Sequence, residues 1–472
     1  MTVPPLKLAV VGHTNTGKTS LMRTLMRDVE FGEVSDRPAV TRDVEAAVLR
    51  AGDEIAIHLF DTPGLEDSIG LLERLESLRG DRRLDGVQVI ARFLDDDASR
   101  RRFGQEAKVL RQVLDSDVAL YVIDARDRVL GKHRDELEIL GMCARPVVPV
   151  LNFTAAEDAR TAEWREHLSR VNMHAVAEFD TVVFDARHEQ RLFEKMRTLL
   201  DAHRPRLDRL IEDRRRQRAA LIGGSARLLA DLLVDAAAFT LHVPAHDREK
   251  MREAIETLKQ QVRRREQRCV DELLALHRFR PGDVEEEALP IEDGAWGMDL
   301  FGPETMKAFG VRAGGGAAAG AMVGLTLDVL LAGLSLGVGT AAGAALGGLF
   351  GAGQTHGRRV FHRLRGLTEL RCDDLTIRLL LARQAALIAA LLRRGHAATD
   401  AIRPAIEAGR GTPRSGRLPP PLLRARTHAH WSQLGEAASR PGPADPAREE
   451  AVAELTGLLA PVLRQEGEVA GS

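Results

Sequence analysis

Cysteine is scarce in this sequence: the chain of 472 residues holds three, Cys143, Cys269 and Cys372, and they lie far apart. No CxxC pair is present, so the sequence predicts neither a zinc site nor a redox motif. Isolated thiols are typical of buried side chains in a protein of a reducing compartment. Residues 1–6 are too short and too rich in proline for a signal peptide, and we expect the protein to be cytoplasmic.

Aromatic residues are also few, at 4%, and neither sign of charge is in large excess. Lys and Arg total 67 against 69 Asp and Glu, which gives a formal net charge of −2. Nucleic-acid-binding proteins usually carry a basic surface, and single-strand binders stack bases on aromatic side chains. Composition therefore does not indicate a nucleic-acid partner. The apolar share of 44% is typical of a folded protein, and the length allows several domains.

Residues 6–204 alternate between short apolar runs and segments with helical spacing. The runs expected to be buried strands lie at 6–11, 55–60, 118–123, 146–151 and 181–184. Strands that alternate with helices predict an α/β domain with a mostly parallel sheet and helices on both faces. We assign residues 1–204 to this domain.

After Pro205 the pattern becomes mainly α-helical. We divide this part into a charged helical region (205–305), a Gly/Ala-rich hydrophobic segment (306–357), a helical region (358–408), a Pro-rich linker (409–423) and a C-terminal helical segment (424–472). Arginine runs in the first region are typical of a solvated helix face. A surface that meets acidic lipid headgroups or RNA is the alternative.

The strongest motif is a glycine-rich segment, Gly12-His13-Thr14-Asn15-Thr16-Gly17-Lys18-Thr19. It matches GxxxxGK[ST], follows the apolar run at 6–11 and precedes a helical pattern, which is the context of a P-loop. Backbone N–H groups of such a loop close around phosphate oxygens. Lys18 is predicted to contact the β- and γ-phosphates, and the hydroxyl of Thr19 to bind Mg²⁺.

Two further segments are spaced for the metal and the γ-phosphate. Asp61-Thr62-Pro63-Gly64 ends the apolar run at 55–60, and an aspartate at the end of a strand holds Mg²⁺, usually through water. The amide of Gly64 is predicted to reach the γ-phosphate. Thr41 is a candidate second hydroxyl ligand to Mg²⁺, on a loop that becomes ordered with the γ-phosphate present, and a plain loop threonine is the alternative. Lys18, Thr41 and Gly64 are the predicted catalytic residues.

These segments carry a family resemblance. GHTNTGKTSL, DRPAVTRDVE and LFDTPGLED resemble the Era and TrmE branch of the translation-factor-like P-loop GTPases, over residues 6–204. The whole chain is also similar to a group of bacterial GTPases with a C-terminal domain of unknown function. The resemblance implies a GTPase that uses GTP, GDP and Mg²⁺, with Thr41 in the first switch and Asp61 at the start of the second.

The guanine-reading segment departs from that family. The family has Asn-Lys-x-Asp, whereas this chain has Asn152-Phe153-Thr154-Ala155. The missing aspartate accepts two hydrogen bonds from guanine, and the loss of such a contact costs about 1–3 kcal/mol. Asp185-Ala186-Arg187 stands where the family has Ser-Ala-Lys, so the amide of Ala186 is expected to donate to guanine O6. Guanine is favoured, and ATP or loose specificity is the alternative.

The predicted nucleotide-binding residues are Gly12, Asn15, Thr16, Gly17, Lys18, Thr19, Ser20, Asp61, Asn152 and Ala186. Leu65 follows Gly64, where Ras-like enzymes place a glutamine that orients water. The resemblance implies another means, because relatives with an asparagine at the position of Asn15 use K⁺ as a stabilising charge. Asn15 is therefore a candidate K⁺ ligand, and a role in loop geometry is the alternative. Turnover on the order of 10⁻⁴–10⁻² s⁻¹ is expected without an arginine finger. Dimerisation of GTPase domains is a further candidate interaction.

Residues 313–357 are rich in glycine and alanine, and Asp328 is the one acidic or basic residue among them besides a histidine. The segment is long enough for two membrane crossings of about 20 residues each. Small residues four apart favour close helix contact, and basic residues flank both ends. We expect a hydrophobic hairpin associated with the cytoplasmic face of a membrane. A soluble hairpin is the alternative, because a charge in the bilayer costs about 2.5–3.5 kcal/mol.

The motifs and the composition are compatible with three functions. The first is a GTP-dependent molecular switch coupled to membrane lipid or an inner-membrane protein through the helical region. The second is a dynamin-like GTPase that remodels membranes. The third is an assembly GTPase for ribosome or tRNA, as in Era and TrmE, although the sequence contains no recognisable RNA-binding module.

Overall fold

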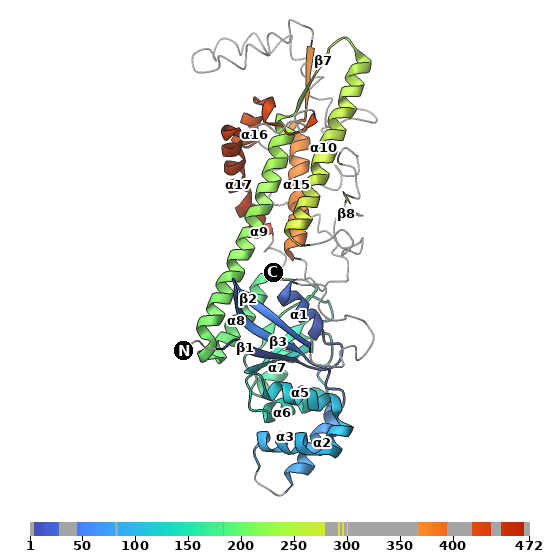
Figure 1. The fold of residues 1–472 in the computed structure, drawn as a ribbon. Coiled ribbons are helices and arrows are strands. Elements are labelled where there is room, and N and C mark those ends of the chain that lie inside the picture. Colours follow the sequence, from blue (N-terminus) through green and yellow to red (C-terminus); the bar gives the residue numbers. More distant parts are fainter. Residues whose placement is uncertain are drawn as a thin grey trace. The chain divides into compact units, whose positions relative to one another are not determined.

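The computed structural model describes residues 4–27, 45–80, 84–182, 184–278, 291–292, 295–296, 300, 367–393, 418–435 and 445–466. Thr41, Asp328 and the whole Gly/Ala-rich segment lie outside the described residues. Backbone contacts divide the chain into two units (Figure 1). The first comprises Met1–Arg218 with Arg393–Thr399, and the second comprises Ala219–Leu392 with Asp400–Ser472.

The first unit contains a six-stranded sheet in the order β2-β3-β1-β4-β5-β6. Its strands are β1 (Leu6–Val11), β2 (Glu45–Ala51), β3 (Glu54–Asp61), β4 (Val118–Asp124), β5 (Val147–Asn152) and β6 (Ala177–Glu178). β2 pairs with β3 in antiparallel register, and the other pairs are parallel. Every residue of β4 is buried, as expected for a central parallel strand covered on both faces. The predicted α/β class with a mostly parallel sheet is confirmed.

The helices of the first unit cover both faces of the sheet. They are α1 (Lys18–Met26), α2 (Ser68–Arg79), α3 (Gly86–Asp95), α4 (Asp97–Arg102), α5 (Gly104–Leu114), α6 (Gly131–Met142), α7 (Thr161–Arg170) and α8 (Ala186–Leu199). Alternate residues of β1 point to opposite faces. Leu8 and Val10 lie in one buried cluster with side chains of α1 and α8. Ala9 and Val11 lie in another, with side chains of α2, α3, α5, α6 and α7.

The strand predicted at 181–184 was wrong. The last strand of the sheet is β6, and the described residues beyond it do not continue the ladder. Backbone N–H groups that would pair with a neighbouring strand donate to side-chain oxygens instead. Thr181 N–H donates to Asn152 Oδ1 at 3.0 Å, and Val182 N–H donates to Asp180 Oδ1 at 2.9 Å. Apolar character alone does not reveal this competition for backbone donors.

The second unit is mainly helical, and α9 (Arg204–Ala238) passes from one unit into the other along the chain. Its further elements are β7 (Thr240–Pro244), α10 (Arg248–Leu276), β8 (Ile291–Glu292), β9 (Ala295–Trp296), β10 (Leu367–Arg371), α15 (Asp374–Arg393), α16 (Pro420–Ala425) and α17 (Pro446–Glu466). β7 pairs with β10 and β8 with β9, both antiparallel. Residues 420–423, predicted as linker, begin α16, because proline is tolerated in the first helical turn where its missing N–H has no partner.

Among the described residues, α15 alone is long and apolar enough to span a membrane. The helix is 72% buried within the protein over its most apolar window, which is typical of a core helix. Three of its buried side chains are polar: Thr376, Arg383 and Gln384. Arg383 Nε lies 2.9 Å from Glu266 Oε1 on α10, and Gln384 donates to the same oxygen at 3.2 Å. The predicted membrane hairpin was placed elsewhere, on residues outside the described part of the chain.

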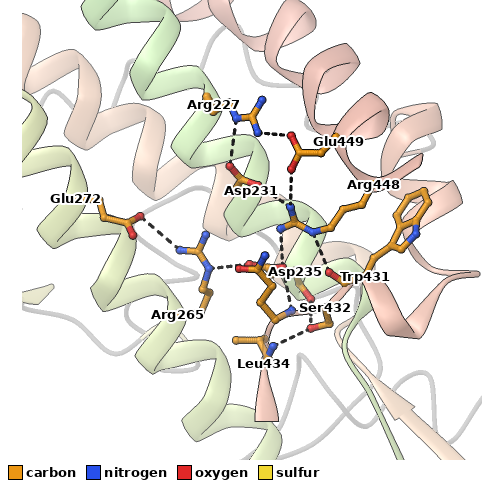
Figure 2. A network of polar contacts seen from close by, with 11 residues as sticks. Arg227, Asp231, Asp235, Arg265, Glu272, Trp431, Ser432, Leu434, Arg448 and Glu449 are labelled. Carbon is orange, nitrogen blue, oxygen red and sulfur yellow. Dashed lines mark hydrogen bonds and ion pairs between the residues drawn. The ribbon is translucent and has the colours of Figure 1, made fainter. Parts of the chain in front are cut away.

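A network of buried ion pairs joins α9, α10 and α17 in the second unit (Figure 2). Asp235 is fully buried, and its carboxylate accepts from Arg265 Nε at 2.8 Å and from Arg448 Nη2 at 2.9 Å. Arg448 also donates to Asp231 at 3.0 Å and to the carbonyl of Trp431 at 2.9 Å. Each charge therefore has a partner of opposite sign, which a buried ion requires.

Candidate functional site

The loop between β1 and α1 has the backbone of a phosphate cradle. Gly17 has φ +87, in the left-handed region that favours glycine. A β-carbon there would lie 2.3 Å from Asn152 Nδ2, and one at Gly12 would lie 2.4 Å from the carbonyl oxygen of Val122. No larger residue fits at either position without displacing its neighbours. The two glycines therefore keep this loop open to a ligand.

Lys18, the first residue of α1, is folded back onto the same loop. Its Nζ donates to the carbonyls of Gly12 at 3.2 Å and His13 at 2.7 Å. Burial lowers the pKa of Lys18 from 10.5 to about 8, partly offset by the charge of Asp61. A buried cation at the N-terminus of a helix is a strong site for phosphate oxygens.

A hydroxyl and a carboxylate meet beside this lysine. Thr19 Oγ1 donates to Asp61 Oδ2 at 2.6 Å, and Asp61 is the last residue of β3. Hydroxyl and carboxylate oxygens are the ligands that Mg²⁺ prefers. Thr14 Oγ1 is buried without a hydrogen-bond partner in the described structure, and a β-carbon at Gly64 would lie 2.4 Å from it. These oxygen groups fit a Mg²⁺-bound phosphate. Thr19 and Asp61 are the residues that would hold the metal.

Asn152 connects the phosphate loop to the next two loops of the sheet edge. Its Nδ2 donates to the carbonyl of Thr16 at 3.0 Å. Its Oδ1 accepts from the amides of Phe153 at 2.9 Å and Thr181 at 3.0 Å. The side chain is buried. Its hydrogen bonds to the protein thus hold three loops together, and its contact with the nucleotide base stays a prediction.

An aromatic side chain packs beside the glycine end of the loop. The Phe153 ring lies 3.2 Å from the position that a Gly17 β-carbon would take, and its backbone has φ +57. The Arg126 guanidinium carbon lies 4.2 Å from the ring centroid. Arg126 also contacts Asp124 at 2.7 Å, and this hydrogen bond raises the pKa of Arg126. Phe153 and Arg126 form a flat, cation-supported surface of the kind on which a base stacks.

Two known protein families match consecutive segments of this chain. A family described as "Domain of unknown function (DUF3482)" matches residues 165–456, more than half of the chain. This chain belongs to that family. A second family, described as "50S ribosome-binding GTPase", matches residues 7–153. The DUF3482 domain therefore follows an Era/TrmE-like P-loop GTPase domain, as predicted, and GTP or GDP with Mg²⁺ is the ligand set of such domains.

Curated relatives match the GTPase domain at low identity. The tRNA modification GTPase MnmE of Bacteroides thetaiotaomicron is 24% identical over 197 residues, 41% of this chain and 41% of that protein. MnmE of Desulfitobacterium hafniense is 34% identical over 128 residues, 27% of this chain and 26% of that protein. GTPase Der of Parvibaculum lavamentivorans is 31% identical over 147 residues, 31% of this chain and 24% of that protein. The chain spans less than half the length of these relatives.

Two solved structures resemble the GTPase domain as well. Era in complex with MgGDPNP and nucleotides of 16S ribosomal RNA aligns at 16% identity and a TM-score of 0.31, covering 43% of this chain and 57% of that one. The G domain of the T. maritima FeoB iron transporter aligns at 21% identity and a TM-score of 0.25, covering 41% of this chain and 99% of that one.

Other predicted residues of the GTPase domain lie as follows. Thr16 is buried, and Ser20 is half-buried in α1. Asn15 is exposed, with φ +63. Ala186 begins α8, after Asp185, whose side chain caps that helix. The structure brings Thr181 to Asn152, whereas no described contact joins Ala186 to it.

Sequence reasoning missed Asp180 and Thr181, because it placed the last strand too late in the chain. Asp180 is buried, and its Oδ2 accepts from the amide of Ala155 at 2.9 Å. The residue that replaces the family's aspartate is therefore held through its backbone by a carboxylate from the neighbouring loop. A polar Asp-Thr pair directly after Val176-Ala177-Glu178-Phe179, where apolar residues outnumber the one charged residue, is the signal that was available.

Proposed function

We propose that this chain binds GTP, hydrolyses it to GDP and phosphate, and acts as a molecular switch. The observation that carries the proposal is the contact of Thr19 with Asp61 at 2.6 Å, beside the buried Lys18. A cation, a hydroxyl and a carboxylate converge there on a glycine-lined loop, which is the arrangement that phosphoryl transfer requires. The family match of residues 7–153 supports it.

In this proposal each residue has a separate task. Lys18 binds β- and γ-phosphate oxygens, and the amide of Gly64 donates to the γ-phosphate. Bound Mg²⁺, held by Thr19, Asp61 and Thr41, would neutralise the charge of the phosphate oxygens. Leu65 is fully buried, so its side chain does not orient water. Slow intrinsic turnover follows, and a second cation or a partner would have to raise it.

The central experiment is a binding and turnover assay with purified full-length chain and GTP, ATP and XTP. High-affinity binding and turnover of GTP are expected, and Lys18→Ala is expected to abolish both. Retained high affinity in Lys18→Ala would show that the phosphate-site assignment is wrong. Tighter binding of ATP than of GTP would overturn the guanine preference that we infer from Asn152.

We further propose that K⁺ at Asn15 supplies the missing charge. Turnover is then faster in K⁺ than in Na⁺. Asn15→Gly is a matched variant, because glycine accepts the φ of +63 while removing the amide oxygen. It should lose the K⁺ stimulation and keep GDP binding. Equal wild-type rates in the two salts would exclude this role. A rate per site that rises with protein concentration would indicate that two GTPase domains act together.

We propose that the switch is coupled to a membrane or an inner-membrane protein at the cytoplasmic face. The support is the composition of residues 313–357, which is apolar apart from Asp328 and His356 and a few uncharged polar side chains. In a flotation assay, full-length protein should float with liposomes. Protein that stays in the soluble fraction would exclude lipid binding. Liposome tubulation with lipid-stimulated turnover would favour dynamin-like remodelling over a switch.

Ribosome or tRNA assembly is the second candidate function. It is favoured by the description of the family that matches the GTPase domain, "50S ribosome-binding GTPase". Nucleotide-dependent co-sedimentation with ribosomal subunits would support it. The absence of co-sedimentation in both the GTP-bound and the GDP-bound state would count against it.

A further inference from the structure

A buried carboxylate lies behind the phosphate loop. Glu136 on α6 is fully buried, and its Oε2 accepts from the hydroxyl of Tyr121 on β4 at 2.6 Å. Its Oε1 lies 3.1 Å from Nδ1 of His13, the second residue of the phosphate loop. Burial raises the pKa of Tyr121 well above its usual value, so the hydroxyl keeps its proton and remains a donor. Glu136 is therefore anchored in the core and bonded to the loop.

The same nitrogen of His13 reaches the second switch. Nδ1 lies 2.8 Å from the carbonyl oxygen of Leu65. A carbonyl oxygen only accepts, and a carboxylate oxygen accepts as well. Nδ1 therefore carries the proton and donates to both oxygens, so that one imidazole N–H joins Leu65 to Glu136. The side chain of His13 is 23% exposed.

Leu65 is held from its other side as well. Its amide donates to the carbonyl of Gly12 at 3.2 Å. The neighbouring Gly64 approaches the loop so closely that a β-carbon would lie 2.8 Å from the Thr14 amide nitrogen. The start of the second switch is thus docked on residues 12–14, with both peptide groups of Leu65 bonded. These bonds limit the directions that the Gly64 amide can take.

We propose that His13 is a positioning residue for GTP turnover: its Nδ1–H holds the Leu65 carbonyl against the anchored Glu136 and so directs the Gly64 amide to the γ-phosphate. The inference rests on the proposed function, because it assigns a task within GTP hydrolysis. GDP lacks the γ-phosphate. Loss of the His13 bond should therefore affect turnover of GTP much more than binding of GDP.

The test compares His13→Ala with His13→Asn in full-length protein. Ala removes the donor, whereas the Asn Nδ2–H group can take the place of the imidazole Nδ1–H. His13→Ala should lower kcat about tenfold or more, as expected for one lost hydrogen bond to the reacting geometry. Its Kd for GDP should stay within about threefold, and His13→Asn should restore most of kcat. The exposed His174, replaced by Ala, is the matched control.

Hydrogen exchange provides a second measurement that does not need turnover. Peptides that cover residues 61–70 should exchange faster in His13→Ala than in wild type or His13→Asn. Absence of turnover in wild type would defeat the proposed function, and exchange would then decide alone whether His13 docks Leu65. The inference would be overturned if His13→Ala had the same kcat and the same hydrogen-exchange rates as the wild-type protein. So would a loss of GDP affinity equal to the loss of kcat, without rescue by Asn, since that pattern indicates a general structural role.

Discussion

Lys18 shows how strongly a single residue of this site depends on its surroundings. Its ammonium group is buried and bonded to two backbone carbonyls, and burial lowers its pKa to about 8. A bound phosphate favours the charged form and raises the pKa again. Nucleotide binding should therefore be accompanied by proton uptake near and above pH 8. Unlike a surface lysine, this residue makes the affinity sensitive to mildly alkaline pH.

We predict that the Kd for Mg²⁺-GDP rises about threefold between pH 7.5 and 8.5, given a free-state pKa of about 8. Below pH 7.5 this linkage should be small, because the lysine is then charged in both states. Calorimetry in two buffers of different ionisation enthalpy measures the proton uptake directly. An affinity that does not change with pH, together with no proton uptake, would contradict the shifted pKa.

Phe153 is a second residue whose role can be isolated. Its ring packs beside Gly17 and under Arg126. We predict that Phe153→Ala weakens GDP and ADP binding by a similar factor, about tenfold, because stacking contributes about 1–3 kcal/mol and does not distinguish purines. Phe153→Tyr keeps the ring and should bind like wild type in an equilibrium fluorescence titration. A loss confined to GDP would instead indicate an effect on base recognition.

At the scale of elements, the segment between β3 and α2 is the part that must approach the phosphate loop. We predict that Gly64→Ala lowers GTP turnover at least tenfold, because the new β-carbon would lie 2.4 Å from Thr14 Oγ1 and 2.8 Å from Thr14 N. GDP affinity should change little, since this contact serves the γ-phosphate. Gly70→Ala would disturb the cap of α2 rather than the loop, so it serves as a comparison. Equal kcat in Gly64→Ala and wild type would contradict the close approach.

Helix α15 combines the composition of a membrane span with the burial of a core helix. Its length and apolar content satisfy the criteria for a membrane span. The structure buries it in the second unit, with Arg383 paired to Glu266 on α10. Removal of either residue would leave the other as an unpaired buried charge, which destabilises the folded protein. Tertiary packing decides the environment of this helix.

At the scale of the whole molecule, the two units have separate cores. The nucleotide site lies in the first, and the ion network around Asp235 lies in the second (Figure 2). A ligand that binds only the native state stabilises the unit it binds, by about 2.7 kcal/mol at a hundredfold excess over Kd. Substitutions in the ion network around Asp235 should change the stability of the second unit.

We therefore predict two separable unfolding transitions in calorimetry. Mg²⁺-GDP should raise the midpoint of one, and Arg448→Ala should lower the midpoint of the other. The variant removes a cation shared by Asp231 and Asp235, which costs about 3–5 kcal/mol when a buried pair is broken. The control variant is Arg464→Ala, at an exposed position of the same helix. One transition that responds to both changes would show that the units unfold together.

The phosphate loop, the Asp61-Thr62-Pro63-Gly64 motif and four of the strands that pair in parallel could be predicted from the sequence. These features depend on residues close in the chain, where glycine, hydroxyl and apolar patterns have local meanings. The contacts of Thr181 with Asn152, of His13 with Glu136 and of Arg448 with Asp235 could not be predicted from the sequence and are known from the folded structure. These partners are 29, 123 and 213 residues apart. Contacts at such separations depend on strand ends, helix faces and packing, which no short motif encodes.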